Sequence, residues 1–293
     1  MIKKIYLTVL ICCMCGLSLQ AQYAYFGSRG TISFDKVTYT KARLRQMSND
    51  MNPKGMDRDG GILDYLDKMP DSHTEKLKLY FDENSTVLMP EENVGSEKQS
   101  NAIKMTAPKA TSANGRGGRF QGAARSGPTP RGQFRGGAKN GKVLYQDLKA
   151  GTADIQLDID EKYILSETLD SITWRFTEEY RNIAGVNCRR VNGATKDSLY
   201  LIAYYSEEIP VSAGPALSHG LPGMIIGLVI PEMHIQYWAT AIEYTNKLVP
   251  SEWRDKKSKK MELNEFSEIF GRYMPRNRQN ESAKKRILEQ LVY

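Results

Sequence analysis

Short segments in which apolar and polar residues alternate recur along most of this chain, and each has the length of a β-strand. The first two are residues 31–39 and 76–81, and a turn from Asp82 to Ser85 follows the second. The remaining segments of this kind are residues 86–89, 143–148, 155–159, 172–176, 199–205, 224–230 and 235–244. Because local turns separate many short strands, the pattern predicts an antiparallel sheet rather than parallel βαβ units.

Other parts of the chain have a helical period. Residues 62–69 have the composition of a short helix that ends before Pro70, which predicts a helical insertion ahead of the first hairpin. Residues 263–270 and 282–293 each have apolar positions on one helical face. The predicted fold is therefore mainly β with some α structure (α+β). It is a curved antiparallel sheet or half-barrel with a helical insertion and two C-terminal helices within residues 258–293.

The first 21 residues have the three parts of a secretory signal peptide. Lys3 and Lys4 supply positive charge, residues 5–19 are apolar, and Ala21 completes a small-residue cleavage site. A membrane anchor is the alternative, but the apolar stretch is short for a span of about 20 residues and no stop-transfer charges follow it. The sequence predicts an exported protein, periplasmic or associated with the outer membrane, with no transmembrane segment in its mature part.

The cysteine content bears on the organisation of the mature chain. The chain has 293 residues and four cysteines, of which three lie within the predicted signal peptide. Cys188 then has no partner for an internal disulfide, so core packing must stabilise the fold. Residues 22–293 are interpreted as a single domain.

Residues 95–142 form a basic, glycine-rich insert in that domain. From residue 98 to 142 there are ten Lys or Arg residues, nine Gly and no acidic residue. Such a composition buries too little apolar surface to offset the entropy of ordering, so the insert is predicted to be disordered. Attraction to an anionic envelope surface is one interpretation, and a solvated loop without a partner is the other. Nucleic-acid binding is not expected of an exported protein with so few aromatic residues among its arginines.

A run of prolines and glycines separates the strands predicted at 199–205 and 224–230. Proline fixes φ and glycine permits close backbone approach, so the run predicts a stiff connecting loop. The motif residues are Ile209, Pro210, Gly214, Pro215, Gly220, Leu221, Pro222, Gly223, Met224 and Ile225. A structural crossover is one interpretation of this motif loop, and a ligand-contacting loop is the other.

The hexapeptide at residues 220–225, Gly-Leu-Pro-Gly-Met-Ile, closely resembles the signature of the GLPGLI family, with Met224 in place of the usual Leu. The upstream Ile209-Pro210 and Gly214-Pro215 pairs are similar to the family pattern, and so is the Trp-containing strand at residues 172–176. GLPGLI proteins are exported proteins of Gram-negative bacteria whose biochemical function is unassigned. The resemblance therefore implies an exported cell-envelope protein and a fold, without an activity.

Several side chains near the motif have donor atoms that suit a soft or borderline metal. They are His219, Met224, Met233, His234 and Cys188. Imidazole with a thioether would suit copper, and imidazole with a thiolate would suit zinc or copper, if pairing of the last two strands brought the histidines together. The spacing lacks a tight metal motif, and the alternative is that the sulfurs are core and the histidines lie at the rim. No cofactor is predicted, and handling of copper or zinc through His219 and His234 is the alternative function.

No recognisable catalytic constellation is present. A nucleophilic Cys188 would need a nearby base, and its surroundings lack the pattern of a nucleophile elbow, so it is interpreted as a small buried apolar residue. The acid pairs Glu207-Glu208 and Asp158/Asp160 are interpreted as solvated polar positions. The predicted function is a non-enzymatic ligand- or partner-binding accessory protein of the cell envelope. Its predicted partner is an outer-membrane import machinery or an anionic envelope surface.

Overall fold

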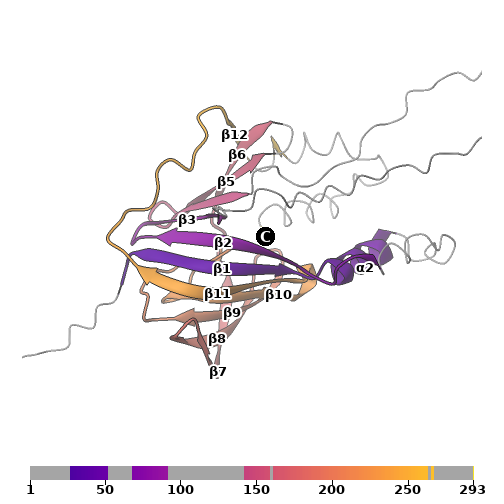
Figure 1. Cartoon of the computed structure of the whole chain (residues 1–293), viewed down its shortest axis with the longest axis horizontal. Coiled ribbons are helices and arrows are strands. Elements are labelled where there is room, and N and C mark those ends of the chain that lie inside the picture. Colours follow the sequence, from indigo (N-terminus) through magenta and orange to yellow (C-terminus); the bar gives the residue numbers. More distant parts are fainter. Residues whose placement is uncertain (1–26, 52–67, 92–141, 159–160, 263–264, 267–292) are drawn as a thin grey trace, which may run out of the picture.

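The computed structural model describes residues 27–51, 68–91, 142–158, 161–262, 265–266 and 293 (Figure 1). In these residues, twelve strands form one sheet, and Thr40–Met51 forms the α-helix α2. No helix in the described part of the chain has the length and apolar character of a membrane span. The strands and the 3-10 helix η1 are β1 Gly30–Thr38, β2 His73–Phe81, β3 Ser85–Pro90, β4 Val143–Asp147, β5 Thr152–Asp158, β6 Lys162–Thr168, β7 Thr173–Ile183, β8 Val186–Ala194, β9 Tyr200–Ser206, β10 Met224–Ile230, η1 Pro231–Met233, β11 Ile235–Tyr244 and β12 Lys259–Glu262.

The sheet combines two meanders that meet at β1. Its strand order is β12-β6-β5-β4-β3-β2-β1-β11-β10-β9-β8-β7, and only the β12–β6 pair is parallel. In Figure 1, β1 lies between β2 and β11, and in register Phe34 is paired with both Leu77 and Ala239. Because β1 and β11 are distant in sequence, this pair joins the N-terminal half of the sheet to the C-terminal half.

The core follows the alternation predicted from the sequence. Ile32 and Phe34 of β1 are at most 1% exposed, and their partners Leu79 and Leu77 on β2 are at most 5% exposed. Burial of these side chains removes apolar area from water at about 25 cal/mol per Å², which is the main favourable term for the sheet. The prediction of a β-rich protein is confirmed.

The predicted fold class is nevertheless wrong. The sheet is open and mixed, with β12 and β7 at its edges, instead of an antiparallel half-barrel. Within the predicted helical segment 258–293, residues 259–262 form strand β12, because the backbone of β6 offers an edge on which they pair. The rest of that segment, except residues 265–266 and 293, lies outside the described residues.

The predicted helical insertion is also unsupported. The α-helix that the structure describes is α2, which starts immediately after β1, ahead of the predicted position at residues 62–69. Of that predicted segment, only residues 68–69 are described. The signal peptide and the basic insert, apart from Lys142, also lie outside the described residues.

Candidate binding surface beside the motif loop

The motif loop, residues 207–223, connects β9 to β10 and folds back onto β10. Ser206 and Met224 are paired in the sheet, so the loop leaves and re-enters at neighbouring positions. The Ile209 carbonyl accepts a hydrogen bond from the Met224 amide at 2.9 Å, and the Ala213 carbonyl accepts one from the Ile225 amide at 2.8 Å. These bonds satisfy backbone groups inside the loop, which would otherwise be costly to bury.

Most apolar side chains of the motif loop point into the core. Ile209 is 0% exposed and Leu221 is 2% exposed, whereas Pro210, Gly220 and Pro222 lie at the surface. Met224 and Ile225, which begin β10, are also fully buried. The arrangement is that of a structural element whose apolar side chains contribute to the core.

Two of the motif glycines are required by packing and one by backbone conformation. A Cβ at Gly223 would lie 2.1 Å from the carbonyl oxygen of Ser206. A Cβ at Gly214 would lie 2.5 Å from the hydroxyl oxygen of Ser218 and 2.6 Å from the Cβ of Ile225. Gly220 instead has a φ of 87°, in the left-handed region that favours glycine. Close approach at residues 214 and 223 therefore explains two of the motif positions without any ligand.

Trp174 links the motif loop to the edge strand β7. Its Nε1 donates a hydrogen bond to the carbonyl oxygen of His219 at 3.0 Å. The indole also occupies the space over Gly193 of β8, where a Cβ would lie 2.4 Å from the ring. The loop thus supports the β7–β8 hairpin from one side.

Further along this hairpin, exposed aromatic rings surround one arginine. Phe176 is 47% exposed and Tyr180 is 56% exposed, both on β7. The Arg189 guanidinium lies 5.4 Å from the centroid of Phe176 and 5.9 Å from that of Tyr180. The buried Tyr205 ring meets Phe176 edge to face at 6.0 Å. We call Phe176, Tyr180, Arg189 and Tyr205 the aromatic–arginine surface.

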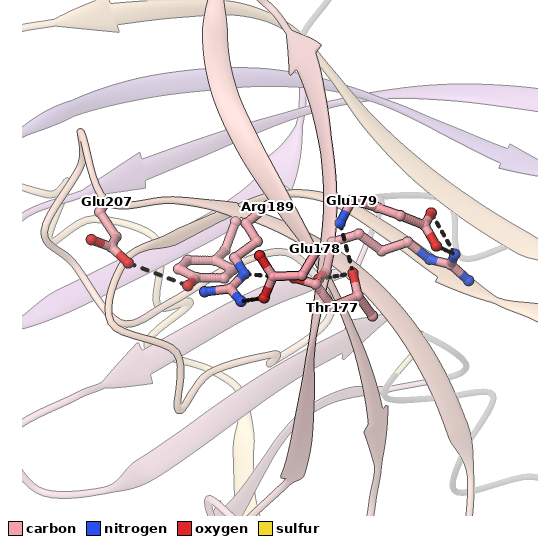
Figure 2. A network of polar contacts seen from close by, with 7 residues as sticks. Thr177, Glu178, Glu179, Arg189 and Glu207 are labelled. Carbon is pink, nitrogen blue, oxygen red and sulfur yellow. Dashed lines mark hydrogen bonds and ion pairs between the residues drawn. The ribbon is translucent and has the colours of Figure 1, made fainter.

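A β-bulge in β7 holds Arg189 in place. The register between β7 and β8 shifts between Phe176 and Tyr180, which leaves residues 177–179 outside the ladder. Arg189 donates through Nε to the Thr177 carbonyl at 2.7 Å and through a terminal nitrogen to Glu178 at 2.6 Å, and Figure 2 shows this contact. These two hydrogen bonds hold the guanidinium in its position near the two rings.

The same bulge anchors a second arginine. Arg190 pairs with the Glu179 carboxylate at 2.6 Å, and this hydrogen bond raises the pKa of the guanidinium. Thr177 donates from its hydroxyl to the Arg190 carbonyl at 2.7 Å. Tyr205 donates to Glu207 at 3.3 Å, and burial together with the charge of Glu207 raises the pKa of the phenol. The acid pair 207–208 is thus engaged locally, since Glu208 accepts from the amide of Asn187.

This surface was not predicted from the sequence. The signal present in the sequence is the placement of acids and arginines on either side of the turn at Ala184 and Gly185, which connects β7 to β8. Counting outward from the Ile183–Val186 pair next to this turn places Glu179 opposite Arg190. An acid facing an arginine across a hairpin is a cross-strand pattern.

The predicted metal donors lie in separate surroundings. The Nδ1 atom of His219 lies 3.0 Å from the Leu217 carbonyl, in the motif loop. His234 follows η1, and its carbonyl accepts a hydrogen bond from the Tyr39 amide at 2.9 Å. Met224 and Cys188 are fully buried, and Met233 is 8% exposed. Within the part of the chain that is described, no three or more His, Cys, Asp or Glu residues are grouped to hold a metal ion.

Cys188 lies in a site that suppresses thiol reactivity. Its side chain is fully buried, and burial, assisted by the charge of Glu208, raises the pKa of the thiol to about 12. A thiol with this pKa is almost entirely protonated at neutral pH and is therefore a poor nucleophile.

We expect Cys188 to resist modification in the folded protein. At about pH 8 the folded thiol is ionised to about one part in 10,000, whereas an unfolded thiol has a pKa of about 8.5. The test uses a chain without residues 1–21 and a disulfide reagent whose reaction is followed by absorbance. The reaction should be at least about a thousandfold slower in buffer than in concentrated guanidinium chloride. Comparable rates in the two solutions would show that the thiol is accessible and activated.

Comparison with known proteins adds one family match. The model of a family described as "Protein of unknown function (Porph_ging)" matches residues 162–227, which is less than half of the chain. The match begins in β6, includes the β7–β8 hairpin and the motif loop, and ends in β10. A search of curated proteins gave no match. The function of the matched family is thus unassigned.

Solved structures give distant similarities. One, titled "Structure of PNGF-II in P21 space group", has a TM-score of 0.48 and 10% identity, and the alignment covers 84% of this chain and 34% of that chain. A second, titled "Structure of PNGF-II in C2 space group", has a TM-score of 0.46 and 11% identity, with 84% and 33% covered. The chain therefore spans about a third of the length of these structures.

Proposed function

We propose that this protein is a non-catalytic binding protein of the bacterial cell envelope, and that it binds a protein partner through the aromatic–arginine surface. The observation that carries the proposal is the fixed position of Arg189 between the half-exposed rings of Phe176 and Tyr180. Aromatic residues and arginine are enriched at interfaces and dominate their binding energy. A surface that is already ordered also loses little conformational entropy on binding.

The position of this surface favours a protein partner. β7 is an edge strand, so its outer backbone groups have no strand partner among the described residues. A polypeptide that lies along this edge can contact both the rings and the backbone. The bulge with its exposed Glu178 and Glu179 interrupts the edge, which is a common protection against indiscriminate strand pairing.

The envelope location and the family are supported by the sequence. The N-terminal 21 residues have the pattern of a signal peptide, and the hexapeptide at 220–225 resembles the GLPGLI signature. We infer that the chain is a GLPGLI-type protein in which the motif loop is a scaffold. Through Trp174, the loop supports the hairpin that carries the binding surface.

Site-specific photocrosslinking tests this function in the organism that makes the protein. A photoreactive phenylalanine is placed at Tyr180, and at Tyr39 as a control that is 39% exposed but lies after β1. We expect a discrete adduct with a protein from position 180 and none from position 39. The adduct should be recovered from the envelope fraction with an N-terminus at Gln22.

In the same experiment, substitutions distinguish loss of the binding surface from loss of the fold. Arg189→Ala should reduce the adduct from position 180 at least tenfold, because losing a binding hot spot costs about 2 kcal/mol or more. Arg175→Ala is the matched control, since Arg175 is an exposed arginine on β7, the strand that carries Tyr180 and pairs with the strand of Arg189. An equal yield from positions 180 and 39, or an equal effect of the two arginine substitutions, would refute the proposed surface. Recovery of the chain from the cytoplasm would refute the location.

A further inference from the structure

Two exposed carboxylates lie next to the aromatic–arginine surface. Glu207 and Glu208 directly follow β9, at the start of the motif loop. Glu207 accepts a hydrogen bond from the Tyr205 hydroxyl at 3.3 Å, and Glu208 accepts one from the Asn187 amide at 3.2 Å. Neither carboxylate forms an ion pair with a residue that the structure describes. We call Glu207 and Glu208 the acidic border.

The sheet places the acidic border close to Arg189. Tyr205, which bonds to Glu207, lies opposite Arg189 in the register of β8 and β9. The amide that bonds to Glu208 belongs to the residue two positions before Arg189 on β8. Figure 2 shows Glu207 on one side of the Arg189 guanidinium and Glu178 on the other. The acidic border and the exposed rings therefore belong to one continuous surface.

Three arginines of the β7–β8 hairpin are engaged by other groups. Arg189 pairs with Glu178 and Arg190 pairs with Glu179, each at 2.6 Å. The Arg181 guanidinium lies over β11, 4.9 Å from the centroid of a tryptophan ring. None of these three guanidinium groups pairs with the acidic border, so its negative charge remains available to a partner.

The exposed rings favour a ligand of the same charge as the acidic border does. Phe176 is 47% exposed and Tyr180 is 56% exposed. The face of an aromatic ring carries negative charge density and attracts a lysine or arginine side chain. Exposed carboxylates attract the same side chains and repel an acidic partner. Two independent features of the surface thus select a cation.

We propose that the partner presents to this surface an extended polypeptide segment that carries lysine or arginine. This inference rests on the proposed function, since it specifies the chemistry of the partner at the same surface. The main chain of the segment lies along the outer edge of β7, and its cationic side chains reach the acidic border and the rings of Phe176 and Tyr180. Complementary charge then decides which polypeptides can pair with this edge.

Photocrosslinking from position 180, repeated with Glu207→Gln and Glu208→Gln combined, tests the charge of the partner. We expect the adduct yield to fall at least about fivefold, because the substitutions remove both charges of the acidic border. Mass spectrometry of the adduct should find lysine or arginine within about three residues of the attachment site, since a strand rises about 3.3 Å per residue. The matched control combines Glu232→Gln with Glu252→Gln, which changes the net charge equally at exposed positions outside the surface and should leave the yield unchanged.

A second measurement uses a purified mature chain and a fluorescent peptide of alternating lysine and valine. We expect saturable binding by anisotropy, which added salt weakens because exposed charges are screened. The peptide of alternating glutamate and valine should not bind. The combined substitution at residues 207 and 208 should weaken binding of the lysine peptide at least about tenfold, whereas the control substitutions at 232 and 252 should not.

The outcomes separate this inference from the proposed function. An adduct from position 180 that is unchanged by the loss of the acidic border, or that joins a segment without lysine or arginine, would overturn the inference and leave the partner surface standing. Absence of an adduct from position 180 would refute the partner surface and the inference together. In the purified system, equal binding of the two peptides, no saturable binding of the lysine peptide, or equal losses in the two double variants would also overturn the inference.

Discussion

Replacing Gly223 with alanine is expected to destabilise the protein by about 3 kcal/mol. The new Cβ would lie 2.1 Å from the carbonyl oxygen of Ser206 and 2.7 Å from its carbonyl carbon. Both atoms are backbone at the end of β9, so neither can rotate away as a side chain could. Relief requires separating the motif loop from the strand that it packs on, with loss of the bonds that join the loop to β10. The free energy of unfolding of the mature chain, from urea titration, measures the effect.

Gly151→Ala is the matched control for this prediction. Gly151 has a φ of 67°, and no atom lies within 4 Å of the position that a Cβ would take. The substitution therefore carries only the conformational cost of a left-handed alanine, about 1 kcal/mol. If Gly151→Ala and Gly223→Ala lost equal stability, the close approach at residue 223 would not be the reason for that glycine.

The second large effect is expected for Leu221→Ala, at the second position of the hexapeptide. The Leu221 side chain is 2% exposed, and truncating it removes buried methyl groups and leaves a cavity. Substitutions of this kind cost about 2–5 kcal/mol, and we expect a value of about 3 kcal/mol. The measurement is the midpoint and slope of urea unfolding, where a lower midpoint with an unchanged slope indicates lost stability.

The neighbouring residue provides the comparison. Pro222 is exposed, so Pro222→Ala should change the free energy of unfolding by no more than about 1 kcal/mol. A small effect of Leu221→Ala, combined with a large effect of Pro222→Ala, would show that the exposed side of the loop is the constrained side. The motif would then be better explained by contact with a ligand than by packing.

Both predictions test whether packing inside the protein explains the amino-acid sequence of the motif. In the structure, the hexapeptide supplies a buried leucine, a glycine at a backbone contact and the first two residues of a buried strand. Each of these requirements is internal to the chain. The motif loop also contacts the β7–β8 hairpin, through the hydrogen bond from Trp174 to the His219 carbonyl.

Many strand positions were predictable where one face of the strand is buried, although β6 and β8, which also bury apolar side chains, were not predicted. The segments 31–39, 76–81, 199–205, 224–230 and 235–244 correspond closely to β1, the end of β2, β9, β10 and β11. In these strands, burial alternates or is continuous, so the hydrophobic pattern records it directly. The partial agreement at β7 has a physical cause. Residues 177–182 form a polar, exposed edge with a bulge, and such an edge leaves no alternating apolar signal.

Other features had no local signal. The strand β12 contains two lysines, one methionine and one glutamate, and it exists because β6 offers a parallel edge for pairing. The spacing of apolar residues predicted helix in this region. That spacing contains no information about a distant backbone edge, so it could not predict the pairing with β6. The position of His219 likewise had no local signal, because the folding of the motif loop decides where it lies, and its carbonyl oxygen accepts a hydrogen bond from Trp174.

Local sequence patterns are enough to predict many of the strands with a buried face, the loop between β9 and β10, and the apolar character of the core, because each depends on the order of side chains over a few residues. The open twelve-stranded order and the arrangement of the rings around Arg189 depend on the tertiary structure. These features depend on pairing between residues that are remote in the chain. Such pairing is selected by the free energy of the whole sheet, and no local pattern specifies it.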